Sequence, residues 1–338
     1  MRNAYHELPK GSLASAGTVM LDWNISARIA NIHRRQSAFE PLNLNAIEME
    51  RLRTLVNTIP VGAEILSAFG AAEPETRRVH TSSNVGRYNE RTDIASVYLS
   101  QLPQYLLHLL DGGDSNGLVI DSELDEIPFK SDAIRSWFMV SYAALLKAVA
   151  IEREVGLSRV ERVDQFRFWL EHELRVSASR ETWIGFLLLA GRGDHPGRAR
   201  RILKSGKTGD VCDSVWGATW DLMYTRIPSL LAQPMFRGCW KLPIAFVTDD
   251  SGLVEAVASV KTVLTLENAH GVAFSGDKAD LTVLHEDVWP IVRSHMARQR
   301  ENVMLRSQGM TTKVLQRAAY LARRLEGEIG GSNHEHQL

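Results

Sequence analysis

Cysteine is scarce in this chain. Its 338 residues contain 2, Cys212 and Cys239, and neither stands in the spacing of a disulfide framework or a zinc site. Long apolar runs are missing as well, because no stretch approaches the ~20 residues of a membrane span. The first residues lack the apolar core of a signal peptide. These absences favour a cytoplasmic protein with reduced thiols and no membrane segment.

Charge of one sign is not in excess either. The sequence has 39 Lys and Arg against 40 Asp and Glu, a net charge of −1. There is therefore no global electrostatic case for nucleic-acid binding, and any basic surface must be local. Hydrophobic residues make up 44% and charged residues 23%, which is typical of a globular protein with a sizeable core. The length suits one large or two ordinary domains.

The stretch Thr18–Leu21 is a short, continuous run of apolar and β-branched residues that ends at a carboxylate, Asp22. Such a run is typical of a parallel strand that is buried on both faces. Open α/β sheets place their ligands at the carboxyl ends of these strands. Asn24 or Ser26 can cap a helix that begins here. The pattern predicts either a ligand-binding acid or a simple capping residue at Asp22.

A second stretch far along the chain has the same form. The apolar run 242–247 leads into Thr248, Asp249 and Asp250, and the spacing of residues 254–260 then predicts a helix. Because parallel strands end at the same edge of a sheet, we expect the two sets of acids to share one site.

Three further acids are candidates. Ile59–Val61 reads as a short strand that turns at Gly62 into a helix, and Glu64 lies in the first turn of that helix. Glu64 either joins the site or only complements the helix dipole. Asp213 and Asp221 lie eight residues apart in a predicted helix, close to two turns. Asp221 stands among bulky apolar residues, so we expect a metal or an arginine to hold it.

Between about 93 and 205 the sequence has helical periodicity and few strand signals, which predicts a large helical insertion. The expected organisation is therefore a first part of an α/β domain at 1–70, the insertion at 71–205, a second part with closing helices at 206–330 and a disordered tail at 331–338. A basic run begins near the end of the insertion and continues just past residue 205. Such a run is most often a solvated face, but beside an acidic site it would contact phosphates; its members are Arg198, Arg200, Arg201, Lys204 and Lys207.

Taken together, these segments resemble the PIN-domain nucleases. The first strand of that family ends in Leu-Asp-x-Asn, matched by residues 21–24, and its last motif is an apolar strand with Thr-x-Asp, matched by Thr248 and Asp250 with Leu253 three residues later. The family's helical Glu corresponds to Glu64 and its third-motif Asp to Asp221. The match covers about 20–70 and 210–260, and two departures are the long insertion and Trp23 in place of a small residue.

The resemblance implies a three-layer α/β/α fold with a central, mostly parallel sheet, and a metal-dependent endoribonuclease of the toxin or defence type, with RNA as substrate and an inhibitory protein as a partner. Asp22, Glu64, Asp221 and Asp250 would form the catalytic cluster. Asp22 and Asp250 would be the primary metal ligands, with Asp221 completing the set and Asp213 in reserve, while Asn24 and Thr248 would orient the carboxylates. A cluster with oxygen donors and no His or Cys indicates Mg²⁺ or Mn²⁺.

Two other functions compete with the nuclease. A haloacid-type phosphatase also begins with a strand that ends in Asp, but it needs a second Asp two residues later, where this chain has Asn24. A non-catalytic, PIN-like RNA- or protein-binding scaffold would keep the fold and bind no metal. The sequence leaves the oligomeric state open.

Overall fold

A computed structural model describes residues 5–8, 10–38, 40, 42, 44–67, 94–113, 132–175, 179–203, 210–226, 241–258, 260–268, 271–307 and 312–330. The chain forms two compact units. We call Met1–Lys130 with Tyr224–Ser251 the sheet unit, and Ser131–Met223 with Gly252–Leu338 the helical unit. Within the described residues, no helix is long and apolar enough to cross a membrane.

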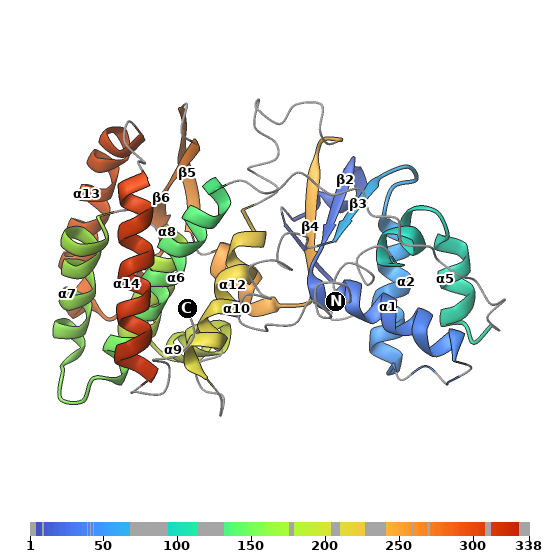
Figure 1. Ribbon diagram of the computed structural model, residues 1–338, viewed down its shortest axis with the longest axis horizontal. Coiled ribbons are helices and arrows are strands. Elements are labelled where there is room, and N and C mark those ends of the chain that lie inside the picture. Colours follow the sequence, from blue (N-terminus) through green and yellow to red (C-terminus); the bar gives the residue numbers. More distant parts are fainter. Residues whose placement is uncertain are drawn as a thin grey trace. The chain divides into compact units, whose positions relative to one another are not determined.

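The sheet unit is built on a four-stranded sheet with the order β1-β4-β2-β3 (Figure 1). The strands β2, β3 and β4 run parallel, and β1 lies antiparallel to β4 at one edge. Their bounds are His6–Leu8 for β1, Thr18–Leu21 for β2, Glu64–Ser67 for β3 and Ile244–Thr248 for β4. The two strands predicted to end in acids, β2 and β4, are therefore parallel neighbours.

Helices pack on one face of this sheet. They are α1 (Trp23–Ser37), α2 (Ala46–Thr58), a helical stretch at 94–100 and α5 (Pro103–Leu110). Alternate strand residues such as Val19, Leu21 and Val247 share one buried core with these helices. Met20 and Phe246 point to the other face, where the ring of Tyr224 stacks on Phe246 at a centroid distance of 6.4 Å. Because β1 is antiparallel and the other three strands are parallel, the sheet is mixed. The three-layer α/β/α arrangement stays a prediction.

Local signals in the sequence set the ends of these helices. Asn45 and Glu48 form a capping box, in which each side chain accepts from the other residue's backbone nitrogen, and it starts α2. The helical periodicity that begins near residue 93 predicts one continuous helix over 94–110, but the structure divides this stretch into two helices. The chain leaves the helix after residue 100, and Pro103 begins α5 at a position where its missing N–H costs nothing.

The helical unit contains most of the predicted insertion together with the C-terminal part of the chain. Among its helices, contacts are densest between α6 and α14, between α6 and α8, and between α8 and α9 (Figure 1). The bounds are α6 Asp132–Arg153, α7 Arg159–Trp169, α8 Ser179–Ala190, α9 His195–Leu203, α10 Val211–Tyr224, α12 Ser251–Ala258, α13 Trp289–Ser307 and α14 Thr312–Gly330. The boundary between the units therefore differs from the predicted one, because α5 belongs with the sheet and α13 and α14 belong with the helices.

Two smaller features complete this unit. A hairpin of β5 (Val260–Asn268) and β6 (Gly271–Ala279) follows α12, so the predicted helix ends before Val260, which begins a strand. Directly after α7 the chain forms a π-helical turn, Leu170–Leu174, that ends at Arg175 in the left-handed region with φ 58°. π-Helical turns are rare and often stand where a side chain has a special role.

Candidate functional site: the carboxyl edge of the sheet

Asp22 lies where β2 ends and α1 begins. It occupies the N-cap position of α1, yet its side chain makes no capping hydrogen bond. Instead, Asp22 Oδ2 accepts a hydrogen bond of 2.7 Å from Thr248 Oγ1. Asp22 is 5% exposed, and a carboxylate this buried requires hydrogen bonds. The alternative that Asn24 or Ser26 caps the helix is wrong: Asn24 is an exposed residue of the first turn, and Ser26 Oγ donates to the carbonyl of Asp22.

Thr248 connects the two acids of this edge. Its side chain is fully buried at the last position of β4, and its hydroxyl accepts a hydrogen bond of 3.0 Å from the backbone nitrogen of Asp250. The hydroxyl therefore donates to Asp22 and accepts from Asp250. Because β2 and β4 are parallel neighbours, Asp22 and the partly exposed Asp250 leave the sheet at the same edge.

Asp249, between these two, points to a pair of arginines. Its Oδ2 lies 2.7 Å from Arg28 Nη2 of α1, and its Oδ1 accepts from Arg51 Nη1 of α2. Burial lowers the pKa of Arg28, but the hydrogen bond with Asp249 and the neighbouring Tyr5 hydroxyl outweigh that effect and raise it overall. Side chains from α1 and α2 thus meet Asp249, which directly follows β4. The sequence motif selected Asp250 and gave no role to Asp249.

Glu64 does not join this edge. It is the first residue of β3 and pairs with Thr18, the first residue of β2, so it lies at the amino edge of the sheet. The prediction that a helix carries Glu64 is wrong. Its Oε2 accepts from Thr18 Oγ1 at 3.2 Å and from the backbone nitrogen of Lys241 at 3.3 Å. At about 3.3 Å per residue, four residues of strand separate Glu64 from the level of Asp22 by roughly 13 Å.

Asp213 and Asp221 both lie on α10, in the helical unit. Asp213 is exposed in the first turn, and Asp221 is partly buried beside the buried Trp220. Within the sheet unit, Thr248 thus links the Asp22 carboxylate to the backbone of Asp250. The participation of the Asp250 carboxylate, of Asp221 and of Asp213 in one site stays a prediction.

The donor set at the edge is small but chemically consistent. Among the described residues, no group of three or more His, Cys, Asp or Glu side chains stands close enough to hold a metal ion. Mg²⁺, however, keeps several water ligands and is usually bound in proteins by one or two carboxylates plus substrate phosphates. Asp22 and Asp250, linked by Thr248, fit that description.

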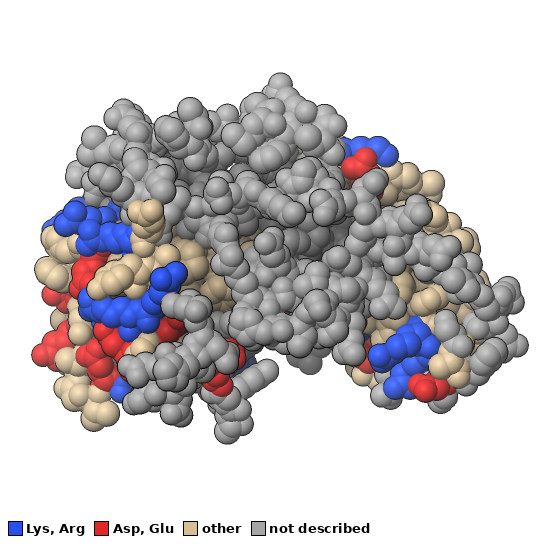
Figure 2. All heavy atoms as spheres, viewed as in Figure 1, with Lys and Arg blue, Asp and Glu red and all other residues tan. Residues whose placement is uncertain are grey.

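The predicted basic run is only partly within the described residues, since Lys204 and Lys207 lie outside them. On α9, Arg198 Nε lies 2.7 Å from Asp194, and the hydrogen bond from Arg198 lowers the pKa of Asp194. Arg200 pairs with Glu152, and Arg201 is exposed. Elsewhere on the helical unit, Figure 2 shows Lys and Arg side chains beside Asp and Glu side chains over the described parts of α7 and α14. Two members of the run thus already have carboxylate partners.

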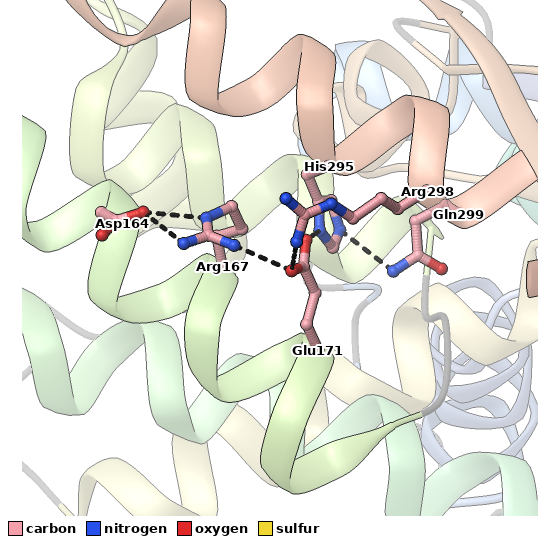
Figure 3. A network of polar contacts seen from close by, with 6 residues as sticks. All are labelled: Asp164, Arg167, Glu171, His295, Arg298 and Gln299. Carbon is pink, nitrogen blue, oxygen red and sulfur yellow. Dashed lines mark hydrogen bonds and ion pairs between the residues drawn. The ribbon is translucent and has the colours of Figure 1, made fainter.

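A second polar cluster, which no sequence signal indicated, lies in the helical unit (Figure 3). Glu171, on the π-helical turn, accepts from His295 Nδ1 at 3.0 Å through Oε1 and from Arg167 at 2.8 Å and Arg298 at 2.6 Å through Oε2. Gln299 lies 3.2 Å from the other ring nitrogen of His295.

The partners of Glu171 determine the direction in which its pKa is shifted. Burial raises the pKa of Glu171, but the hydrogen bond and charge of His295 and the charges of Arg167 and Arg298 outweigh it and lower the pKa to about 2. The carboxylate and the imidazole are both almost fully buried, with side-chain exposures of 8% and 2%. We interpret the cluster as a set of polar contacts that holds α7 and its π-helical turn against α13.

Comparison with known proteins adds no relative. No protein-family model, no curated protein and no solved structure matches the chain.

Proposed function

We propose that this protein is a metal-dependent endoribonuclease that hydrolyses RNA phosphodiester bonds at the carboxyl edge of its sheet, within a PIN-like three-layer α/β/α domain. The observation that carries the proposal is the Thr248 hydroxyl, which donates to the Asp22 carboxylate and accepts from the backbone nitrogen of Asp250 where two adjacent parallel strands end. Open α/β sheets bind their ligands at such an edge.

In this proposal Asp22 and Asp250 hold one or two Mg²⁺ or Mn²⁺ ions, and Thr248 fixes the direction of the Asp22 carboxylate. When bound, such an ion lowers the pKa of a water molecule and stabilises the charge of an in-line displacement at phosphorus. Asp221 would supply a further carboxylate, with Asp213 in reserve. Glu64 is not included, because its carboxylate lies at the opposite edge and already accepts from Thr18 and Lys241.

The second candidate is a non-catalytic PIN-like scaffold that binds RNA or protein. One observation favours it: Asp22 and Asp249 already have partners within the protein, Thr248 for the first and Arg28 with Arg51 for the second. An inhibitory partner and a toxin or defence role belong to the nuclease alternative and come from the family resemblance alone.

Cleavage of a labelled single-stranded RNA with Mg²⁺, with Mn²⁺ or with EDTA separates the two candidates. The wild type should cleave only with metal, and Asp250→Asn should lose cleavage while its melting temperature stays the same or rises, because one of the clustered negative charges is removed. Asp111→Asn is the matched control, since Asp111 is an exposed acid of the sheet unit that pairs with Arg53. Equal cleavage by wild type and Asp250→Asn, with contaminating nuclease excluded, would refute the nuclease.

A further inference from the structure

The end of α7 presents two neighbouring aromatic rings to solvent. Phe168 is 52% exposed, and its ring centroid lies 4.4 Å from that of His172, four residues later, with the two planes tilted by 38°. His172, on the π-helical turn, is exposed as well. Rings that are open to solvent offer a stacking surface to flat ligands, and nucleobases are ligands of this kind.

Two arginines converge on the backbone of the same residue. The carbonyl oxygen of His172 accepts a hydrogen bond of 2.9 Å from Arg175 Nε and one of 3.4 Å from Arg317 Nη2 of α14. Within the part of the chain that the structure describes, neither guanidinium has a carboxylate partner. A guanidinium has five N–H donors, so both arginines keep donors for a further acceptor.

The carboxylates around this turn are bound by other arginines. The pairs are Asp164 with Arg167, Glu171 with Arg167 and Arg298, and Glu173 and Glu328 with Arg324. Once Arg175 and Arg317 are included, five arginines of this group stand against four carboxylates, so the group is cationic. The positive charge that no carboxylate offsets lies at the His172 carbonyl, beside the exposed rings.

The backbone at this place has an uncommon conformation. Arg175 ends the π-helical turn with φ 58°, in the left-handed region that residues with a Cβ rarely adopt, and its N–H donates to the carbonyl of Leu170 at 2.9 Å. Conformations of this kind persist only where their surroundings fix them, and they are frequent at ligand-binding sites. On α14, Tyr320 is 64% exposed and lies one turn after Arg317, so a ring accompanies the arginines on the second helix as well.

We propose that this face of the helical unit binds single-stranded RNA, with bases stacked on Phe168 and Tyr320 and phosphates bound by Arg175 and Arg317. Exposed rings beside cationic side chains are the means by which proteins hold single strands without reading their sequence. The ligand follows from the proposed nuclease, so the inference rests on that function and adds a substrate contact in the helical unit. An acidic protein would engage the arginines and would not need the rings.

The first part of the test concerns stacking. Fluorescence anisotropy would follow a short labelled oligouridylate and an abasic strand of the same length, with EDTA present so that neither is cleaved. Phe168→Ala should weaken binding of the RNA by about tenfold without changing its salt dependence, because a stacking contact is lost and no charge is. Phe168→Tyr, which keeps the ring, should bind as the wild type does. The abasic strand should bind more weakly than the RNA and should not respond to Phe168→Ala.

The second part concerns charge. Arg175→Asn and Arg317→Gln should each lower the slope of log K against log salt by about 0.7, the contribution of one phosphate contact on a single strand. Asparagine suits position 175 because it tolerates the left-handed backbone conformation. Both strands should respond alike, since the abasic strand keeps its phosphates. Arg293→Gln is the control, because Arg293 is an exposed arginine of α13 that lies over the ring of Trp289.

Arginines that only cap the end of the π-helical turn behave differently. Their variants would lower the melting temperature and bind RNA with the wild-type slope, and that result overturns the inference. Equal binding of RNA and abasic strand by the wild type, or a preference for polyglutamate over RNA, would overturn it too. Failure of the proposed function is distinguishable: a wild type that binds RNA through Phe168 and never cleaves it would lose the nuclease and keep this face. Cleavage that depends on Asp250, with binding unaffected by these variants, would do the reverse.

Discussion

Thr248 Oγ1 lies 2.7 Å from Asp22 Oδ2 although the two residues are 226 positions apart in the chain. The same hydroxyl accepts from the backbone of Asp250. One buried oxygen thus fixes a carboxylate from the first part of the chain against a strand end from the last part.

Replacing Thr248 by Val should destabilise the protein by about 1–3 kcal/mol, because a buried carboxylate oxygen loses its donor while the shape of the side chain is kept. Thr248→Ser, which keeps the hydroxyl, should recover most of the loss. Urea denaturation of both variants and of the wild type measures the free energies of unfolding. Equal values for Thr248→Val and wild type would show that the hydroxyl is dispensable.

Glu64→Gln should retain most of any metal-dependent RNA cleavage, because Glu64 lies at the opposite edge of the sheet from Asp22 and Asp250. The comparison is the cleavage rate at saturating RNA for Glu64→Gln, Asp250→Asn and wild type. Loss of cleavage in a folded Glu64→Gln protein would return this residue to the site that the sequence alone predicted.

Millimolar Mn²⁺ should raise the melting temperature of the wild type, because a ligand that binds only the folded state stabilises it by mass action. At a hundredfold excess over Kd the gain is about 2.7 kcal/mol. Differential scanning fluorimetry should show this shift reduced or lost in Asp250→Asn. A wild-type curve that neither Mn²⁺ nor Mg²⁺ moves would rule out the metal site.

Acid should weaken the helical unit through Glu171. Its pKa is about 2 in the folded protein, against 4.5 as the ordinary value. A depressed pKa means that the stabilisation is complete above about pH 4.5 and is lost as the pH falls toward 2. The difference of about 2.5 pKa units corresponds to about 3 kcal/mol.

Glu171→Gln should therefore lower the free energy of unfolding at pH 7 and flatten its dependence on pH between about 4.5 and 2. Glu173→Gln is the matched control, since Glu173 lies on the same π-helical turn and forms only a 3.6 Å pair with Arg324. Identical acid profiles for wild type and Glu171→Gln would contradict the assigned cause.

The sequence predicted the two central strands because each is a continuous apolar run that stops at a carboxylate, a pattern tied to burial on both faces. Glu64 was misplaced because Ile59–Val61 resembles a strand. In the structure this segment is a turn, with Ala63 N bonded to Pro60 O and Gly62 at φ 81°, and the strand begins only afterwards. Pro60, with Gly62 two residues later at the third position of the turn, was the signal for it.

Long-range polar contacts could not be predicted in the same way. Arg51 and Asp249 are 198 positions apart, and Glu171 and His295 are 124 apart. No local periodicity links such residues, because their meeting depends on how whole elements pack. The hydrogen bond from Thr248 to Asp22 could be predicted in part. The Thr-x-Asp pattern marked Thr248 as a partner of the carboxylates, but its acceptor, Asp22, depends on the pairing of β4 with β2.

The place of β4 in the sheet has a consequence for how the chain is made. β4 lies between β1 and β2, yet it is synthesised more than 200 residues after them. At about 5–20 residues per second, a ribosome needs roughly 10 to 45 s to travel from Asp22 to Thr248. Throughout that interval one edge of β2 has no strand to pair with, and an unpaired edge is a template for association with other chains. Until the last strand of the sheet emerges, that edge of β2 is open to pairing with another chain.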